Sequence, residues 1–275
     1  AVNDHDPRRR PVYMYEPNNR TTDGLLKTGP GQGFVLEGAY VHNLGWDVRR
    51  ALRINWAMDQ MTAAAAKDGR VVVPGFELSQ DMPGFTAKDI ETDPDVRVRL
   101  RRLLRHDVYL AVARGAKGFQ VWSLFPFRPH LTTYLEVMRA YGEVFREFTA
   151  SPLNLQEPIL FGERRDDVAV EVVKGPSFIS APPKEGTLAA VEGTIDVQSE
   201  RWPSVRLANI AHGTERILIL VNSAADPVEV RLAGIPAEAR LVTVSGGDFA
   251  RVDRVADGVA ASLSPFAAVV LRLTR

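Results

Sequence analysis

The first 150 residues alternate short apolar runs with long amphipathic stretches, and this alternation limits the possible folds more than any other feature of the chain. The apolar runs are rich in β-branched and aromatic residues and are bounded by turn residues; they cover residues 12–16, 34–41, 71–78 and 118–125. Runs of this length and composition are typical of buried strands. Because parallel strands need a long crossover between them, the order predicts a parallel sheet wrapped by helices.

The amphipathic stretches predict three helices. Val48, Leu52 and Trp56 recur at helical spacing behind Asp47, which is a suitable N-cap. A second helix is expected over residues 95–114, with leucines on one side, arginines mostly on the other and Gly115 directly after it. A third, over residues 131–148, follows the fourth strand.

The sequence pattern changes near residue 159, where the helical spacing of apolar residues stops and short strand-like runs recur. These runs cover residues 168–173, 205–208, 217–221, 228–232, 240–244 and 267–273. Turn residues such as Asp226-Pro227 and Gly246-Gly247 separate them. We therefore expect an antiparallel β-sandwich of roughly seven to nine strands. The predicted organisation is an α/β domain over residues 1–150, a linker over 151–158 and the sandwich over 159–275.

Composition and motifs exclude several classes of protein. The 34 Lys and Arg balance 34 Asp and Glu, which argues against a nucleic-acid-binding protein. No run approaches the roughly 18 apolar residues of a membrane span. There are 0 cysteines, and none of the 5 histidines stands at helical i, i+4 spacing to another ligand, so no metal site or cofactor is expected. P-loop, dinucleotide-binding and nucleophile-elbow motifs are also missing.

Acidic side chains fall where a parallel sheet would place its reacting groups, at the carboxyl ends of the strands. Glu16 ends the first run, Glu37 lies in the second, Glu77 comes at the end of the third and Trp122 lies in the fourth. Carboxylates beside an aromatic platform are the groups that a sugar site needs. Glu37 is the least ordinary of them, because an apolar strand tolerates a carboxylate badly without a partner.

Each of these residues also has a structural explanation. A glutamate at a strand end often forms a salt bridge or caps a loop. Tyr40, His42 and Asn43, at and just past the second run, could bind sugar hydroxyls or have no specific role. The arginines between residues 96 and 105 are better explained as a solvated helix face than as a phosphate site.

The order of elements resembles the C-terminal portion of a (β/α)8-barrel glycoside hydrolase with its accessory β-domain. Three stretches carry the resemblance: residues 71–78 look like the seventh barrel strand with its glutamate, 107–123 like the last helix and the eighth strand with its tryptophan, and 262–271 like the closing strand of the β-domain. The resemblance implies the second half of the barrel, strands five to eight, followed by the sandwich. A closed barrel needs about 250 residues.

The resemblance implies a retaining glycoside hydrolase acting on an oligo- or polysaccharide. Glu77 matches the nucleophile, whereas the acid/base glutamate of strand four matches nothing in this chain. Glu16 and Glu37 would orient Glu77 or hold hydroxyls, and Trp122 would form the floor of the subsite. A second polypeptide, or a second copy of the chain, is expected to complete the barrel, and neither nucleic acid nor a membrane is an expected partner.

The sequence leaves other possibilities open. The chain could be a non-catalytic carbohydrate-binding or structural subunit, with exposed Trp202 or Phe249 as glycan platforms. The first half could instead be an open doubly wound sheet with helices on both faces and a switch in strand order. A secreted or periplasmic location is favoured, because polysaccharide-directed enzymes are often exported. The chain begins with Ala1 rather than Met, which indicates a processed product or a piece of a longer chain.

Overall fold

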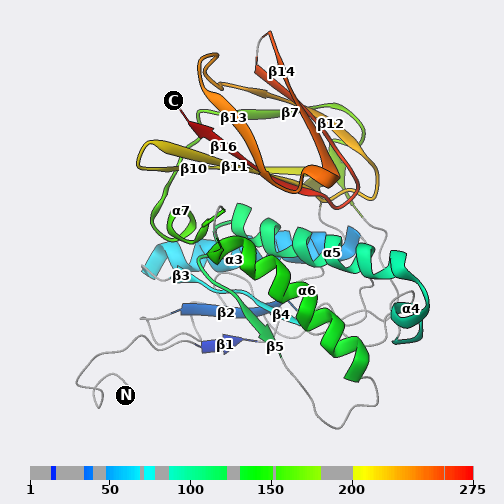
Figure 1. Ribbon diagram of the computed structural model, residues 1–275. Coiled ribbons are helices and arrows are strands. Elements are labelled where there is room, and N and C mark those ends of the chain that lie inside the picture. The colour runs from blue at the N-terminus through cyan, green and yellow to red at the C-terminus, as the bar shows by residue number, and fades with distance from the viewer. Residues whose placement is uncertain are drawn as a thin grey trace.

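The structure is a computed structural model, and it describes residues 14–16, 34–39, 48–68, 71–77, 87–122, 131–150, 153–180, 201–256 and 258–274. Figure 1 shows three layers: a parallel sheet, a layer of helices and a β-sandwich on the far side of the helices. In the described residues, no helix is long and apolar enough to cross a membrane.

The parallel sheet contains the strands expected in the first half of the chain. They are β1 (Met14–Glu16), β2 (Phe34–Ala39), β3 (Val71–Val72), β4 (Gly75–Glu77) and β5 (Gln120–Trp122). The neighbours run in the order β1-β2-β4-β5, with β3 beside β2, and every pairing is parallel. Spatial order therefore follows chain order, and these strands show no order switch of the kind that a doubly wound sheet requires.

The third predicted run forms two short strands rather than one. β3 ends at Val72, and β4 begins at Gly75 after Pro74. Proline has no N–H to donate to the ladder, so it interrupts a central strand. The carbonyl of Pro74 still accepts a hydrogen bond from the Gln120 N–H at 3.0 Å, which keeps β5 in register.

The three predicted helices are present, and two short ones accompany them. The helices are α3 (Val48–Asp68), α4 (Ala87–Thr92), α5 (Pro94–Ala113), α6 (Leu131–Thr149) and α7 (Gln156–Phe161). α7 lies across the end of the predicted linker, where Pro158 and Ile159 are buried. A six-residue helix is too short to produce a recognisable period in the sequence.

α5 begins and ends at the signals that its sequence carries. The Asp93 side chain accepts a hydrogen bond from the Asp95 N–H, and Pro94 occupies the first turn, where its missing N–H has no consequence. Gly115 follows the helix at φ +114°, a conformation that a residue with a Cβ rarely adopts.

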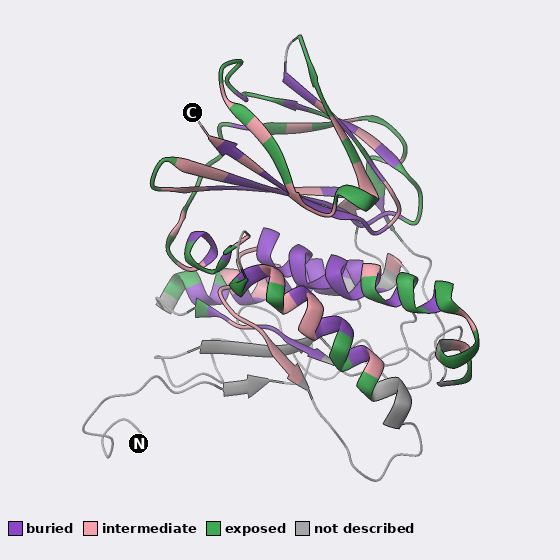
Figure 2. Cartoon of the chain, in the orientation of Figure 1, coloured by how far each residue is buried: buried purple, intermediate pink, exposed green. Residues whose placement is uncertain are grey.

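The C-terminal half of α5 is buried on all sides. Every residue from Leu103 to Ala113 is buried, and Figure 2 shows this part of the helix enclosed between the two neighbouring layers. α5 packs on α3 and α6 on one side and on strands of the sandwich on the other. A helix buried on every face is normally apolar all round, and Arg105, His106 and Asp107 are the exceptions here.

The second half of the chain forms the predicted antiparallel sandwich. One sheet has five strands in the order β13-β16-β11-β10-β6, and the other has four in the order β14-β15-β12-β7. The first sheet contains β6 (Glu163–Arg164), β10 (Val205–His212), β11 (Glu215–Asn222), β13 (Arg240–Ser245) and β16 (Ala268–Thr274). The second contains β7 (Ala169–Lys174), β12 (Val228–Ala233), β14 (Ala250–Val255) and β15 (Gly258–Leu263). A short pair, β8 (Phe178–Ile179) and β9 (Trp202–Pro203), lies beside them.

Leu104 provides a test of the packing around α5. It is 0% exposed, so truncation to Ala should leave a cavity and lower the free energy of unfolding by about 3 kcal/mol. Val98→Ala on the same helix is the matched control, because Val98 is 54% exposed and its loss should change stability by less than about 0.5 kcal/mol. Urea unfolding followed by circular dichroism measures both. Equal stabilities for the two variants would contradict the burial of α5.

Candidate functional site

The strand register places the four predicted strand residues in two pairs. Glu16 is the register partner of Glu37 on β1 and β2. Glu77 is the partner of Trp122 on β4 and β5, where both are the last residues of their strands. The carboxyl ends of β4 and β5 therefore bring the predicted nucleophile and the predicted aromatic platform to the same level of the sheet.

The two pairs lie at different levels of the sheet. Ala39 pairs with Phe76; Glu37 is two positions before Ala39 and Glu77 is one position after Phe76, so the levels differ by three positions. At ~3.3 Å per residue this is roughly 10 Å along the strands. The side chains of Glu16, Glu37, Glu77 and Trp122 lie outside the described part of the chain, as do Tyr40, His42 and Asn43 entirely. The roles assigned to these seven residues stay predictions.

An aromatic cluster fixes which face of the parallel sheet meets the helices. Phe76 is buried, with its ring centroid 5.9 Å from that of Tyr141 on α6 and 5.9 Å from that of Phe119, just before β5. Phe119 stacks in turn on Phe145 at 5.5 Å. Phe76 therefore lies on the helix-facing side of β4, immediately before Glu77 in the strand.

A serine, a histidine and an aspartate meet between α5 and the sandwich. The Nδ1 atom of His106 lies 2.9 Å from an oxygen of Asp107, and its Nε2 atom lies 2.9 Å from the Ser223 hydroxyl. The order resembles a hydrolytic triad. However, the three residues are 0–1% exposed, and Asp107 also forms a salt bridge with buried Arg50. An external substrate does not reach Ser223, so the arrangement is structural.

A second polar cluster joins the helices to the sandwich. Arg105 donates to Glu147 of α6 at 3.0 Å and to the Ser245 hydroxyl of β13 at 2.5 Å, and also to the carbonyl of Ala268 on β16. The Tyr109 hydroxyl donates to Glu147 at 2.7 Å. We call Arg105, Tyr109, Glu147 and Ser245 the interlayer cluster. The partly buried Arg105–Glu147 pair thus receives further hydrogen bonds from three elements, which offset its loss of solvent.

Burial strongly affects the acid–base behaviour of this cluster. Removal from solvent raises the pKa of Tyr109 well above its usual value of 10, and the neighbouring Glu147 raises the pKa further. The Arg105 charge opposes this shift without cancelling it. Tyr109 therefore stays protonated in the folded protein at a pH where an exposed tyrosine ionises.

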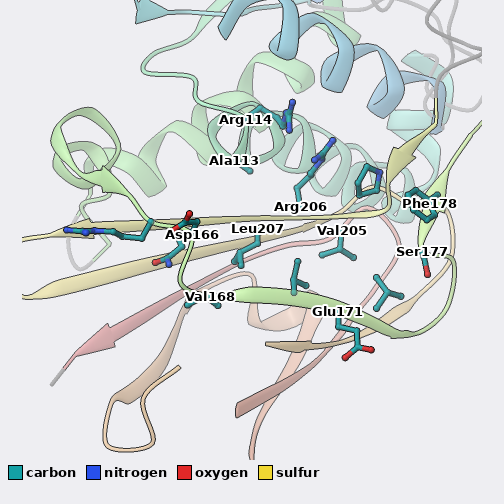
Figure 3. A pocket seen from close by; sticks show the side chains of 15 residues that line it. Ala113, Arg114, Asp166, Val168, Glu171, Ser177, Phe178, Val205, Arg206 and Leu207 are labelled. Atoms are coloured by element: carbon teal, nitrogen blue, oxygen red, sulfur yellow. The ribbon is translucent and has the colours of Figure 1, made fainter. Parts of the chain in front are cut away.

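A cavity of about 650 Å³ opens between the C-terminal end of α5, β10 and β7. Figure 3 shows Arg114 and Arg206 with their guanidinium groups beside each other on the helix side of β10, whereas Val205 and Leu207 point to its other side, toward β7. Asp166, Glu171, Ser177 and Phe178 also line the cavity. Its size falls within the range of small-molecule sites.

The indole ring of Trp202 lies close to both guanidinium groups. The guanidinium carbon of Arg114 lies 5.9 Å, and that of Arg206 5.6 Å, from the ring of Trp202. Trp202 is only partly exposed, and Phe249 packs partly buried against the core. The expectation that these two residues are exposed is therefore wrong, because both are partly buried.

Sequence reasoning missed the cavity and both buried polar clusters. Arg114 and Arg206 are 92 positions apart in the chain, a separation that no local motif bridges. A signal did exist in α5, where Arg105, His106 and Asp107 interrupt an otherwise apolar helix end. Polar residues on every side of a buried helix point to partners in another layer. Within the described residues, no group of three or more His, Asp or Glu side chains could hold a metal ion.

Comparison with known proteins finds similarity in fold only. No family model matches the chain, and no curated protein matches its sequence. Among solved structures, an alpha-amylase from H. orenii has 9% identity and a TM-score of 0.48, covering 98% of this chain and 54% of that one. AmyP in complex with maltose has 12% identity and a TM-score of 0.49, covering 95% and 55%. A Bacillus licheniformis trehalose-6-phosphate hydrolase has 8% identity and a TM-score of 0.46, covering 97% and 56%.

The chain thus spans about half the length of the structures it resembles. Their names are those of an alpha-amylase, of AmyP bound to maltose and of a trehalose-6-phosphate hydrolase, and each is matched over nearly the whole of this chain. At such identities and TM-scores the likeness assigns neither an activity nor a substrate to this chain. An activity or a substrate for this chain has to be argued from its own residues.

Replacing Tyr109 with Phe tests the interlayer cluster through its pH dependence. Above pH 10 the unfolded chain releases the phenolic proton while the folded chain keeps it, so the stability from this group is present below pH 10 and falls as pH rises. The variant should lose about 1 kcal/mol at pH 7, for the missing hydrogen bond. Between pH 10 and 12 its stability should fall less steeply than that of the wild type, by about 1.4 kcal/mol per pH unit. Urea unfolding at several pH values measures this; parallel profiles would show that Tyr109 ionises normally.

Proposed function

We propose that this chain is the C-terminal part of a retaining (β/α)8-barrel glycoside hydrolase, with Glu77 as the nucleophile. The observation that carries the proposal is the register of Glu77 with Trp122 at the carboxyl ends of adjacent parallel strands. Strands that follow one another in space as in the chain, with connecting helices packed on one face, are what half of such a barrel requires.

The position of Glu77 fits this assignment. Phe76 occupies the helix-facing side of β4, and successive positions along a strand alternate between its two faces. The Glu77 position then belongs to the face away from the helices, which is the interior in a barrel. In barrel enzymes the reacting groups lie at the carboxyl ends of the strands, where β4 ends at Glu77.

Glu37 and Glu16 take a supporting role in this proposal. Glu37 and Glu16 lie three positions before the level of Glu77 along the strands. An odd offset of this kind means opposite faces of the sheet. Regular alternation therefore assigns them to the helix-facing side of the sheet. We propose that Glu37 and Glu16 help to hold the sheet and its loops, and that direct sugar contacts come from Trp122 and from Tyr40, His42 and Asn43.

The proposed chemistry is a double displacement. The Glu77 carboxylate attacks the anomeric carbon while a carboxylic acid protonates the departing glycosidic oxygen, and water then releases the sugar from Glu77. The acid/base group comes from the N-terminal half of the barrel, about 5 Å from Glu77, as retaining enzymes require. The substrate is an oligo- or polysaccharide.

The helix beside the last strand supports the proposal of a completing half barrel. β5 is an edge of the sheet, and α6 follows it in the chain. Leu135 and Met138 on α6 are 54% and 46% exposed, and space is open around Gly142 one turn later. With Phe145 and Thr149 these residues form a stripe at the i, i+3, i+7 spacing of a helix that packs on another. The stripe leads into an apolar cavity of about 220 Å³ beside Phe119. We call Leu135, Met138, Gly142, Phe145 and Thr149 the α6 stripe.

A non-catalytic carbohydrate-binding or structural subunit is the second candidate. Trp202 and Phe249, which this candidate would use as platforms, are partly buried, and this favours the enzyme. An active assembly would favour the enzyme, whereas glycan affinity without turnover would favour the binding subunit.

The role of Glu77 is tested in the protein assembled with its N-terminal half barrel. Glu77→Ala should lower kcat on aryl glycosides at least about 10³-fold, because the covalent intermediate cannot form. Added azide should restore turnover and give the glycosyl azide of inverted configuration, which distinguishes a lost nucleophile from a lost acid. Glu157→Ala, an exposed glutamate on α7, is the control and should keep full activity. Undiminished activity of Glu77→Ala would exclude the assignment.

The α6 stripe is tested by the mass of the assembled protein. Met138→Glu places a charge in the proposed helix contact and should shift native mass toward the single 30.4 kDa chain, with an unchanged thermal midpoint for that chain. Arg139→Gln, one position away and off the stripe, should leave the mass unchanged. A wild-type protein that is already a single chain, with glycosidase activity, would contradict the need for a completing half.

A further inference from the structure

We propose that Arg114 and Arg206 form a binding site for an oxyanion, the carboxylate or phosphoryl group of a small polar molecule, at the cavity between α5 and β10. The site lies at the end of α5 that leads into the start of β5. It is therefore at the opposite end of the strands from Glu77. The proposal goes beyond the proposed glycosidase function, and neither depends on the other.

The first observation is an excess of positive charge. Arg114 forms an ion pair with Asp59 of α3, and Arg206 donates to the neutral amide oxygen of Asn55 at 3.1 Å. Among the described residues, no carboxylate forms an ion pair with Arg206. Of the two neighbouring guanidinium groups, only that of Arg114 is therefore neutralised by a carboxylate. Like charges close together in a partly desolvated site repel each other. An anion between the two guanidinium groups would attract both and offset this repulsion.

The acid–base behaviour of the two arginines agrees with this. Burial, followed by the charges of Arg206 and Arg164, lowers the pKa of Arg114 to about 10 despite its ion pair with Asp59. Burial also lowers the pKa of Arg206. Both groups would be more stable as cations if an anion lay beside them.

The second observation is that two donors beside the site have no acceptor, although both atoms are themselves buried and Trp202 does not line the cavity. The Nε atom of Arg114 and the Nε1 atom of Trp202 are buried, and neither has a hydrogen-bond partner. Each buried donor left unpaired costs about 1–3 kcal/mol. The arginine that caps the helix does not have this problem: Arg164 donates to the carbonyls of Ala113 and Val112, the last of α5. Arg164 is therefore engaged in capping the helix C-terminus, whereas Arg114 and Arg206 are not.

The cavity supplies the remaining features of a small-molecule site. Its volume of about 650 Å³ has room for a molecule of one to three rings, and its walls mix valines and Leu207 with Ser177 and Asn209. The carboxylates on its far side, Asp166 and Glu171, are exposed residues. Figure 3 shows Glu171 on the β7 side of the cavity, away from the two guanidinium groups, and Asp166 close to the ribbon of β10. The arginine end of the cavity is thus the end that selects an anion.

The test uses the full chain with inorganic phosphate, D-glucuronate and D-glucose, at an ionic strength held constant with sodium chloride. Calorimetric titration and the thermal midpoint are both recorded. We expect saturable binding of at least one of the two anions, none of glucose, and a dissociation constant at least tenfold larger in Arg206→Gln. Arg251→Gln, an 81% exposed arginine on β14, is the matched control and should bind as the wild type does. Binding of phosphate alone identifies a phosphoryl ligand, and binding of glucuronate alone a carboxylate ligand.

A measurement on the wild type protects the test against a variant that does not fold. Phenylglyoxal modifies accessible arginines, and peptide mapping by mass spectrometry reports each site. The bound anion should slow modification of Arg114 and Arg206 several-fold and leave Arg251 unaffected. No saturable binding of either anion to the wild type, or equal protection of all three arginines, would overturn the proposal.

Discussion

The burial of α5 between two layers is the constraint on which the rest of this structure depends. Its C-terminal half exposes no residue between Leu103 and Ala113, so both the parallel sheet with its helices and the β-sandwich are built against it. Dispersion and burial of apolar surface hold such a helix, but they do not fix its rotation. The rotation is fixed by Arg105, which reaches Ser245 on β13, and by His106, which reaches Ser223 in the loop after β11. The position of the cavity at the end of α5 follows from that fixed rotation.

Much of this fold could be predicted from local pattern, and the reason is visible in particular elements. The second predicted helix matches α5 almost residue for residue, since Pro94 begins it and Gly115 follows its end. The strands β14 and β15 were not predicted. Burial alternates weakly along β14, which is an edge strand with Arg251, Asp253 and Arg254 exposed. An edge strand of that kind has little apolar periodicity to detect.

The candidate site was less predictable, because a site is made by contacts between distant residues. Strand ends gave Glu77 and Trp122, and parallel pairing alone is enough to bring such residues to one level. The three-position offset of Glu37 could not be predicted, because the register between two strands depends on contacts that the sequence of one strand does not show. Trp202 shows the same limit in the sandwich: an aromatic residue in a polar segment predicts exposure, whereas two arginines from different elements cover it.

The two proposed sites lie at opposite ends of the parallel strands. At the carboxyl ends, β4 and β5 stop at Glu77 and Trp122, and loops of any length can follow without disturbing the layers beneath. At the amino end of β5, α5 and β10 are held by Asp59, Asn55 and the shared indole of Trp202, so a ligand there meets groups that are already fixed. A site made from rigid elements loses little entropy when it binds. An anion held by Arg114 and Arg206 would therefore act on the contact between the helices and the sandwich rather than on the chemistry proposed for Glu77.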